Sequence, residues 1–246
     1  MRIALMSDIH GNRQAFEACL AHAEGLAPDR YAILGDLVGY GADPDWVVDR
    51  VREMVGRGAI ALLGNHDEAV LAGQGDLNAA ATVAMLWTRQ RLGAPALDFL
   101  GALPLAVEEE DRLYVHAEAS APQRWHYVLD ADDARRSLEA TDQRLTFCGH
   151  THIPRLFGIT AAEKLMAFHP VSAVPVPLRR PRRWLAVLGA VGQPRDGNPA
   201  ACYAVFDTES QELAWHRVPY DVAGAAAAIL AAGLPEMLAT RLYGGH

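Results

Sequence analysis

Cysteine is scarce in this chain, and no C-x-x-C pair is present. Cys19, Cys148 and Cys202 are an odd number at wide spacing, which excludes a disulfide framework and a thiolate zinc site and favours a reducing compartment. The chain also lacks long hydrophobic runs. The apolar run 3–6 is too short for a secretory signal, and no run approaches the length of a membrane span. We therefore expect a cytoplasmic protein with no membrane partner.

An excess of positive charge is missing as well, because 22 Lys and Arg face 30 Asp and Glu, for a formal net charge of −8. This balance argues against a broad basic face for nucleic acid or anionic membrane. It still allows a phosphate-bearing substrate, since bound divalent cations reverse the local field. The 246 residues are 51% hydrophobic and show no separating linker, so we expect one domain over residues 1–246 with a sizeable core.

Strand and helix patterns alternate in the N-terminal part of the chain. Apolar runs at 2–7, 30–34 and 59–63 predict buried strands, and apolar residues at helical spacing predict helices over 13–25 and 43–55. Such alternation indicates βαβ units and a parallel sheet core.

Residues 67–103 are rich in alanine and leucine and predict two or three helices, which we interpret as a helical insertion near the rim of the active site. The rest of the chain predicts further short strands and closing helices. The predicted strands are 105–108, 112–116, 144–148, 164–168, 184–188, 201–207 and 211–217, and the predicted helices are 132–140, 221–232 and 235–242. This order indicates an α/β (α+β) fold in which two sheets pack face to face with helices outside.

Clusters of Asp, Asn and His follow the predicted strands. They are Asp8-x-His10, Gly35-Asp36, Gly64-Asn65-His66-Asp67, His116 and Gly149-His150-x-His152. Because ligands of α/β sheets gather at the carboxyl ends of the strands, these distant clusters are expected to converge on one rim.

The mixture of oxygen and nitrogen donors suits Mn, Fe, Zn, Ni or Co. Asp8 and His10 are two apart in what we expect to be extended chain, so both would point to the same side and bind one ion. Asp36 is well placed to bridge two ions. Two cations about 3.5–4 Å apart would clamp a phosphoryl group and lower the pKa of a bridging water. His66 would stay free to protonate a leaving oxygen or to stabilise the charge of the transition state.

In this order the five blocks resemble those of the calcineurin-like metallophosphoesterase superfamily. The motifs cover residues 8–152, and the resemblance in fold extends over nearly the whole chain. It implies a four-layer αββα sandwich of two mixed β-sheets flanked by helices. It also implies a hydrolase in which a metal-bound hydroxide attacks a phosphoester without a covalent enzyme intermediate.

The resemblance also implies the ligands of two divalent transition metal ions. One ion would be held by Asp8, His10, Asp36 and His152, and the other by Asp36, Asn65, His116 and His150. His66 would be the catalytic histidine. Manganese is our first expectation for the metal, with Fe, Zn, Ni and Co as alternatives.

The segment 189–197 resembles one in small bacterial phosphoesterases, including a branch that hydrolyses diadenosine polyphosphates, although Ala190 replaces the usual serine. Gly39-Tyr40 stand where the protein serine/threonine phosphatases of the superfamily carry Asp-Arg, which weighs against a protein phosphatase. We expect Arg195 to supply a replacement phosphate contact. Asn12 either contacts a substrate phosphate or caps the next helix, and Tyr40 lies near the rim, within reach of a substrate.

We therefore expect an enzyme that hydrolyses a small phosphodiester, phosphomonoester or dinucleoside polyphosphate. One alternative is a non-catalytic scaffold of the same fold that binds a partner. The other is a nuclease, which the net charge disfavours. The oligomeric state stays open.

Overall fold

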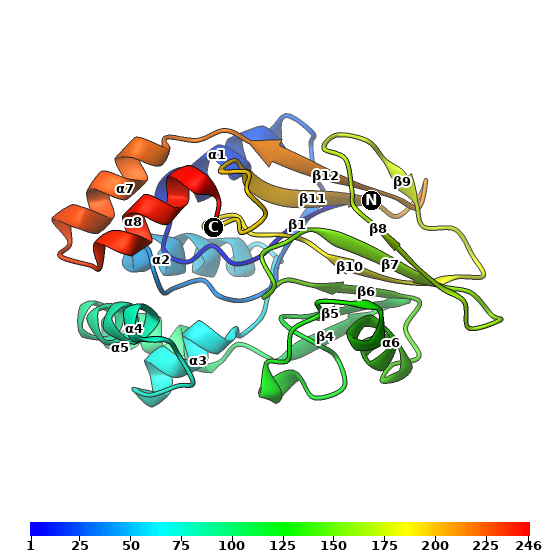
Figure 1. Cartoon of the computed structure of the whole chain (residues 1–246), viewed down its shortest axis with the longest axis horizontal. Helices are drawn as coiled ribbons and strands as arrows, with labels where there is room; N and C mark the ends of the chain where they lie inside the picture. Colours follow the sequence, from blue (N-terminus) through cyan, green and yellow to red (C-terminus); the bar gives the residue numbers. More distant parts are fainter.

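Two mixed six-stranded β-sheets form the centre of the computed structural model, which describes residues 1–246 (Figure 1). The first sheet has the order β3 (Ile60–Ala61), β2 (Arg30–Ile33), β1 (Arg2–Met6), β11 (Ala201–Asp207), β12 (Glu212–Val218) and β9 (Val176–Pro177). The second has the order β4 (Ala106–Glu109), β5 (Arg112–Val115), β6 (Leu145–Cys148), β10 (Arg183–Val187), β7 (Arg155–Ile159) and β8 (Leu165–Phe168).

Each sheet has a parallel part and an antiparallel part. Strands β1, β2 and β3 are parallel, and β11 joins β1 antiparallel. In the second sheet β5, β6 and β10 are parallel, whereas β4, β7 and β8 pair antiparallel. The predicted parallel core is therefore confirmed only in part. Strands β7 and β9 were not predicted separately.

Eight α-helices accompany the sheets. They are α1 (Arg13–Glu24), α2 (Pro44–Gly56), α3 (Asn65–Ala72), α4 (Ala79–Arg91), α5 (Ala94–Gly101), α6 (Ala131–Glu139), α7 (Val222–Ala231) and α8 (Glu236–Gly244). None of them combines the length and the apolar character that crossing a bilayer requires.

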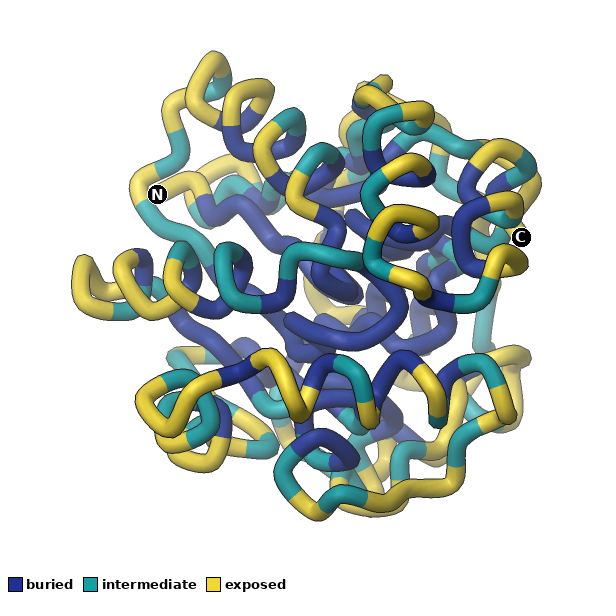
Figure 2. Tube along the Cα trace, turned by 90° about the vertical axis from the view of Figure 1, so that its left-hand side faces the viewer, coloured by how far each residue is buried: buried dark blue, intermediate teal, exposed yellow.

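Burial explains the layers. A core that includes Tyr114, Phe147, Phe206 and Trp215 fills the space between the two sheets. Helices α1 and α2 cover the outer face of the first sheet, and α6 covers the second. Figure 2 shows the buried strands in the interior and the exposed residues on the surrounding helices and loops. The predicted four-layer αββα sandwich is confirmed.

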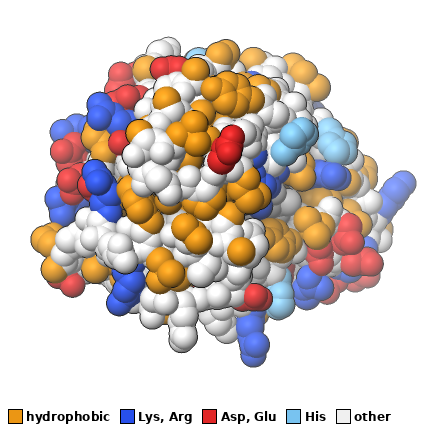
Figure 3. Space-filling view, turned by 60° about the vertical axis from the view of Figure 1, so that its left-hand side comes forward, with side chains coloured by type: hydrophobic (Ala, Val, Ile, Leu, Met, Phe, Trp, Pro, Cys, Tyr) orange, Lys and Arg blue, Asp and Glu red, His pale blue; other side chains and the backbone are white.

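The stretch predicted as a helical insertion forms α3, α4 and α5, at the same end of the molecule as α7 and α8 (Figure 1). Helix α3 begins at Asn65, two residues earlier than predicted. Helices α4, α7 and α8 share a small core of their own, and this end of the molecule presents many hydrophobic side chains (Figure 3).

Candidate metal centre

The loops after β1, β2, β3, β5 and β6 bring the predicted site residues together at the carboxyl ends of the strands. Five of these residues have a left-handed backbone, with φ between 51° and 63°, and they are Asp8, His10, Asp36, His150 and His152. Non-glycine residues seldom adopt this conformation, and it concentrates at functional sites. The expectation of extended chain at Asp8–His10 is therefore wrong. The strand ends in an abrupt turn, and this turn brings the side chains of Asp8 and His10 to the same cluster.

Hydrogen bonds hold these loops against one another. The backbone N–H of His10 donates to the carbonyl of Asp36 at 2.9 Å. The backbone N–H of His150 donates to Asp8 Oδ2 at 3.0 Å, and that of His66 donates to Asp36 Oδ1 at 2.8 Å. The two carboxylates thus orient the loops that carry their neighbours.

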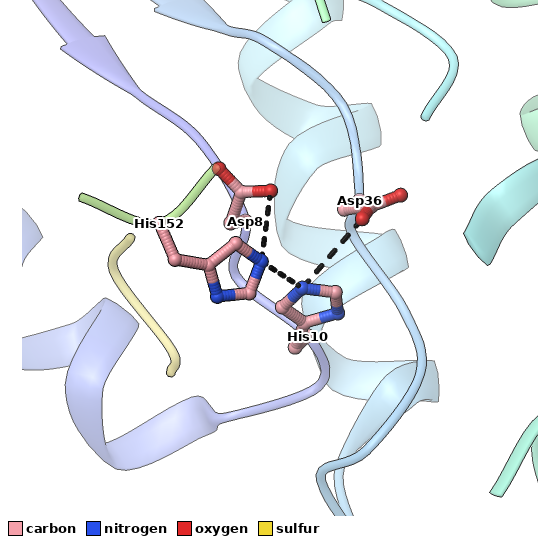
Figure 4. Close-up of side chains that lie close together, drawn as sticks. All are labelled: Asp8, His10, Asp36 and His152. Atoms are coloured by element: carbon pink, nitrogen blue, oxygen red, sulfur yellow. Dashed lines mark hydrogen bonds and ion pairs between the residues drawn. The ribbon is translucent and has the colours of Figure 1, made fainter. Parts of the chain in front are cut away.

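The first cluster comprises Asp8, His10, Asp36 and His152, all of them buried (Figure 4). His10 Nε2 lies 3.6 Å from Asp36 Oδ2, and His152 Nε2 lies 3.3 Å from Asp8 Oδ1. The Nε2 atoms of His10 and His152 are 3.1 Å apart. Four ligand atoms therefore converge on a point that one ion could occupy.

The second cluster comprises Asp36, His116 and His150, so Asp36 belongs to both. His116 Nε2 lies 3.5 Å from Asp36 Oδ2 and 3.2 Å from Asn65 Oδ1. The structure thus brings all seven predicted ligands to one place. Their role as ligands stays a prediction.

Each of the four clustered histidines has one ring nitrogen against a backbone carbonyl. The pairs are His10 Nδ1 with Val38 at 3.1 Å, His116 Nδ1 with Leu34 at 2.6 Å, His150 Nε2 with Trp125 at 2.9 Å, and His152 Nδ1 with Gln193 at 2.6 Å. A carbonyl only accepts, so a proton belongs on that nitrogen, and the other nitrogen faces the cluster, where its lone pair can bind a metal ion. Metal-binding histidines are oriented in this way.

The donor set fits a divalent transition metal ion. It offers carboxylate and amide oxygens and imidazole nitrogens, while the three cysteines contribute to neither cluster. Two imidazole lone pairs that face each other at 3.1 Å, as in His10 and His152, repel, and a cation between them removes the repulsion.

Charge is concentrated at the centre. Burial alone would raise the pKa of Asp8, but His152 and His116 together lower it to about 2. Burial alone would lower the pKa of His116, but Asp36 raises it to about 9. The carboxylates are thus ionised and need a nearby positive charge. A bound cation would supply that charge, and it would displace the second proton of His116.

His66 lies beside the clusters and belongs to neither. Its ring packs against Tyr40 and His10, with centroid separations of 4.5 and 4.9 Å, and its Nδ1 is buried without a hydrogen-bond partner. Burial lowers the pKa of His66 to about 4, against the opposing charge of Asp36. Each cluster histidine has one ring nitrogen bonded to a backbone carbonyl, whereas neither ring nitrogen of His66 has such a partner.

Asn12 is engaged in the fold. Its Oδ1 accepts from the N–H of Ala15 at 3.1 Å and so caps α1, and its amide donates to the Gly192 carbonyl at 2.8 Å and to the Tyr220 hydroxyl at 3.4 Å. The capping alternative describes what the structure holds, and contact with a substrate phosphate would require breaking one of these bonds.

Sequence reasoning missed an aromatic wall on the His150 side. The Tyr127 ring stacks on His150, with centroids 4.1 Å apart and planes 17° apart, and the indole of Trp125 donates to Glu68 at 2.7 Å. Both aromatic residues, together with Asn65, line a cavity of about 170 Å³. Nothing in their spacing signals this role, because they lie in an irregular loop between β5 and α6.

Known proteins resemble this chain over its whole length. The calcineurin-like phosphoesterase superfamily domain matches residues 1–211. An uncharacterized protein of Methanocaldococcus jannaschii is 33% identical over 252 residues, covering 99% of this chain and 98% of that protein. The crystal structure of a metallophosphoesterase from Sphaerobacter thermophilus is 38% identical with a TM-score of 0.89, covering 100% of this chain and 99% of the other.

A hypothetical protein of Pyrococcus horikoshii shares the fold at 18% identity, with a TM-score of 0.82 and coverage of 100% of this chain and 98% of the other. The fold is that of a metallophosphoesterase, and its two clusters of Asp and His side chains could hold metal ions. The chain belongs to the calcineurin-like phosphoesterase superfamily.

Proposed function

We propose that this protein is a dinuclear-metal-dependent phosphoesterase that hydrolyses a small phosphodiester, phosphomonoester or dinucleoside polyphosphate. The observation that carries the proposal is the sharing of Asp36 by two clusters of buried ligand atoms. A carboxylate common to two sites is the arrangement that two adjacent cations need. We propose manganese as the first metal to test, with Fe, Zn, Ni and Co as alternatives.

When bound, the two ions would polarise the phosphoryl oxygens and lower the pKa of a water molecule between them. The chain itself supplies the rest. Asp8, His10 and His152 would hold one ion, and Asn65, His116 and His150 the other. The four carbonyl contacts of the histidines fix the side-chain orientation before a metal arrives.

We propose His66 as the catalytic group that acts on the substrate. It is 5% exposed, lies against His10 of the first cluster, and has no carbonyl that commits a ring nitrogen. It can therefore donate an N–H to a phosphoryl oxygen or protonate the leaving oxygen, with a typical contribution of about 10²- to 10⁴-fold. The small cavity next to Asn65 and His150 supports a small substrate.

The test is a substrate panel at fixed Mn²⁺, comprising p-nitrophenyl phosphate, bis-p-nitrophenyl phosphate and diadenosine tetraphosphate, with metal content measured on the same sample. We expect two metal ions per chain and turnover of at least one substrate. Full metal loading without any turnover would instead support the non-catalytic scaffold. Cleavage of single-stranded or duplex DNA on a gel would support the nuclease.

Two variants separate the roles. His66→Gln should lower kcat by about 10²-fold or more with both ions retained, because the side chain acts on the substrate. Asp36→Asn should lose metal, because it weakens both clusters at once. Loss of metal from His66→Gln would mean that His66 is a ligand.

A further inference from the structure

Two arginines meet at Tyr40, beside the proposed metal centre. The guanidinium carbon of Arg195 lies 5.8 Å from the centroid of the Tyr40 ring, and that of Arg241 lies 6.0 Å from it. The same ring contacts His10 and His66, at centroid separations of 4.6 and 4.5 Å. Tyr40 thus connects the two cations to the edge of the first cluster.

Neither arginine has an Asp or Glu partner. Arg195 donates to the Tyr40 hydroxyl at 3.3 Å and to Gln193 Oε1 at 3.2 Å, and its Nε is buried without an acceptor. Arg241 donates from Nε to the oxygen of His246, the last residue of the sequence, at 2.6 Å and pairs with no acidic side chain. None of these acceptors belongs to an Asp or Glu side chain.

The two fully buried arginines of the fold differ in this respect. Arg112 is paired with Glu109 and Glu110, and Arg144 with Asp111. Arg195 and Arg241 are partly buried, so water shares in their solvation, but the buried Nε of Arg195 has no acceptor, and an anion at this place would supply one.

The origin of Arg241 strengthens this argument. Helix α7 carries no charged residue, and α8 carries only Glu236 and Arg241. Burial lowers the pKa of Arg241, and the positive charge of Arg195 lowers it further. The single cation of a charge-poor helix pair is therefore held next to a like charge, where an anion would relieve the repulsion.

We propose that Arg195, Arg241 and Tyr40 form a subsite for a second, non-reacting phosphate group of the substrate. The reacting phosphate would bind at the two clusters and His66. The Tyr40 ring lies between these residues and the two arginines. The subsite rests on the proposed function and narrows it, because it selects substrates that carry two or more linked phosphates over those that carry one. Two guanidinium groups match the several oxygens of such a phosphate.

The experiment measures binding to the Mn²⁺-loaded protein and needs no turnover. The ligands are the non-hydrolysable methylene phosphonate analogues of AMP and of ADP, which share the nucleoside and differ in the second phosphate. We expect the ADP analogue to bind about tenfold tighter or more. Arg241→Gln and Arg195→Gln should each remove most of that advantage, as measured by titration calorimetry.

Arg180→Gln is the matched control. Arg180 is exposed and pairs with Asp111 at 3.0 Å. It precedes the N-terminal end of β10, whereas the site lies at the carboxyl ends of the parallel strands. It should keep the preference for the ADP analogue. Arg241→Lys keeps the charge and should retain part of the preference, which guards against an effect of misfolding.

Several results would overturn the subsite. These are equal affinity for the two analogues, no measurable binding of either, or a preference that survives both glutamine variants. Free orthophosphate that binds wild type and loses affinity in Arg241→Gln, while the ADP analogue shows no advantage, would mean that the pair holds a free anion. Failure of the proposed function is a separate result, since it appears as absent turnover with the substrate panel.

Discussion

Gly39 offers a sharp test of the role of His66. Its φ is 92°, and a Cβ added there would lie 2.7 Å from His66 Nδ1. Gly39→Ala therefore imposes two separate costs. The left-handed backbone costs about 1–2 kcal/mol for any L-residue, and the methyl group forces the His66 ring to retreat by more than half an ångström to reach ordinary contact.

The size of the effect follows from this displacement. A misplacement of about 1 Å in a catalytic group can lower turnover by about 10²-fold. His66 is confined by Tyr40 and His10, so its ring has little room to move without tilting. We expect kcat to fall by about 10- to 100-fold in Gly39→Ala, with two ions still bound because neither cluster contains His66.

Gly58→Ala is the matched control. Gly58 has a φ of 96°, and an added Cβ there meets no atom within 4 Å. Gly58→Ala should lose about 1–2 kcal/mol of the free energy of unfolding in urea, Gly39→Ala should lose at least as much, and only Gly39→Ala should lose turnover of bis-p-nitrophenyl phosphate. NMR signals of the His66 imidazole provide a second measurement. If both variants lose turnover equally, or neither does, the reasoning about His66 is refuted.

Three further predictions concern other parts of the fold. Gly64 has an ordinary φ, yet its added Cβ would lie 2.2 Å from Asp36 Oδ1, so Gly64→Ala should lose metal and about 3 kcal/mol of stability, whereas Gly56→Ala, with no atom nearby, should not lose metal. Asn12→Ala removes the cap of α1 and should cost about 1 kcal/mol in urea unfolding, and an effect on KM larger than this loss would contradict a purely capping role. Burial and His22 lower the pKa of His216, so the unfolded chain takes up the proton first and stability falls as the pH drops below about 6.5. His216→Gln should make that fall shallower, and equal slopes for both proteins would refute the assignment.

Much of the fold could be predicted because its signals are local. The apolar run 2–7 before Asp8 predicts β1, and Asp43-Pro44 marks the start of α2 at its capping position. The pairing of β11 with β1 could not be predicted in the same way, because it joins segments about two hundred positions apart in the sequence. Strand β7 begins directly after His152-Ile153-Pro154, so little sequence separates it from the histidine block.

The gathering of the site residues could be predicted because strand ends meet at one edge of a sheet. The local geometry could not. The left-handed turns at Asp8 and His10 arise from bonds to the Asp36 loop, which only the folded chain provides. Arg241 carries no motif and reaches Tyr40 only because α8 packs back on the N-terminal half of the chain.

The neighbourhood of Gly39 and Tyr40 shows how this chain differs from the protein phosphatases of its superfamily. Those proteins carry Asp and Arg at these two positions. Here Gly39 lies next to the His66 ring and offers it no carboxylate, so His66 Nδ1 is buried without a hydrogen-bond partner. The His66 ring packs against Tyr40, and the backbone N–H of His66 donates to Asp36, so these two contacts position the residue instead. The positive charge that an arginine at position 40 would carry is supplied here by Arg195, which donates to the Tyr40 hydroxyl. Two arginines, Arg195 and Arg241, lie beside the tyrosine at position 40, and the proposed subsite for a second phosphate depends on this pair of positive charges.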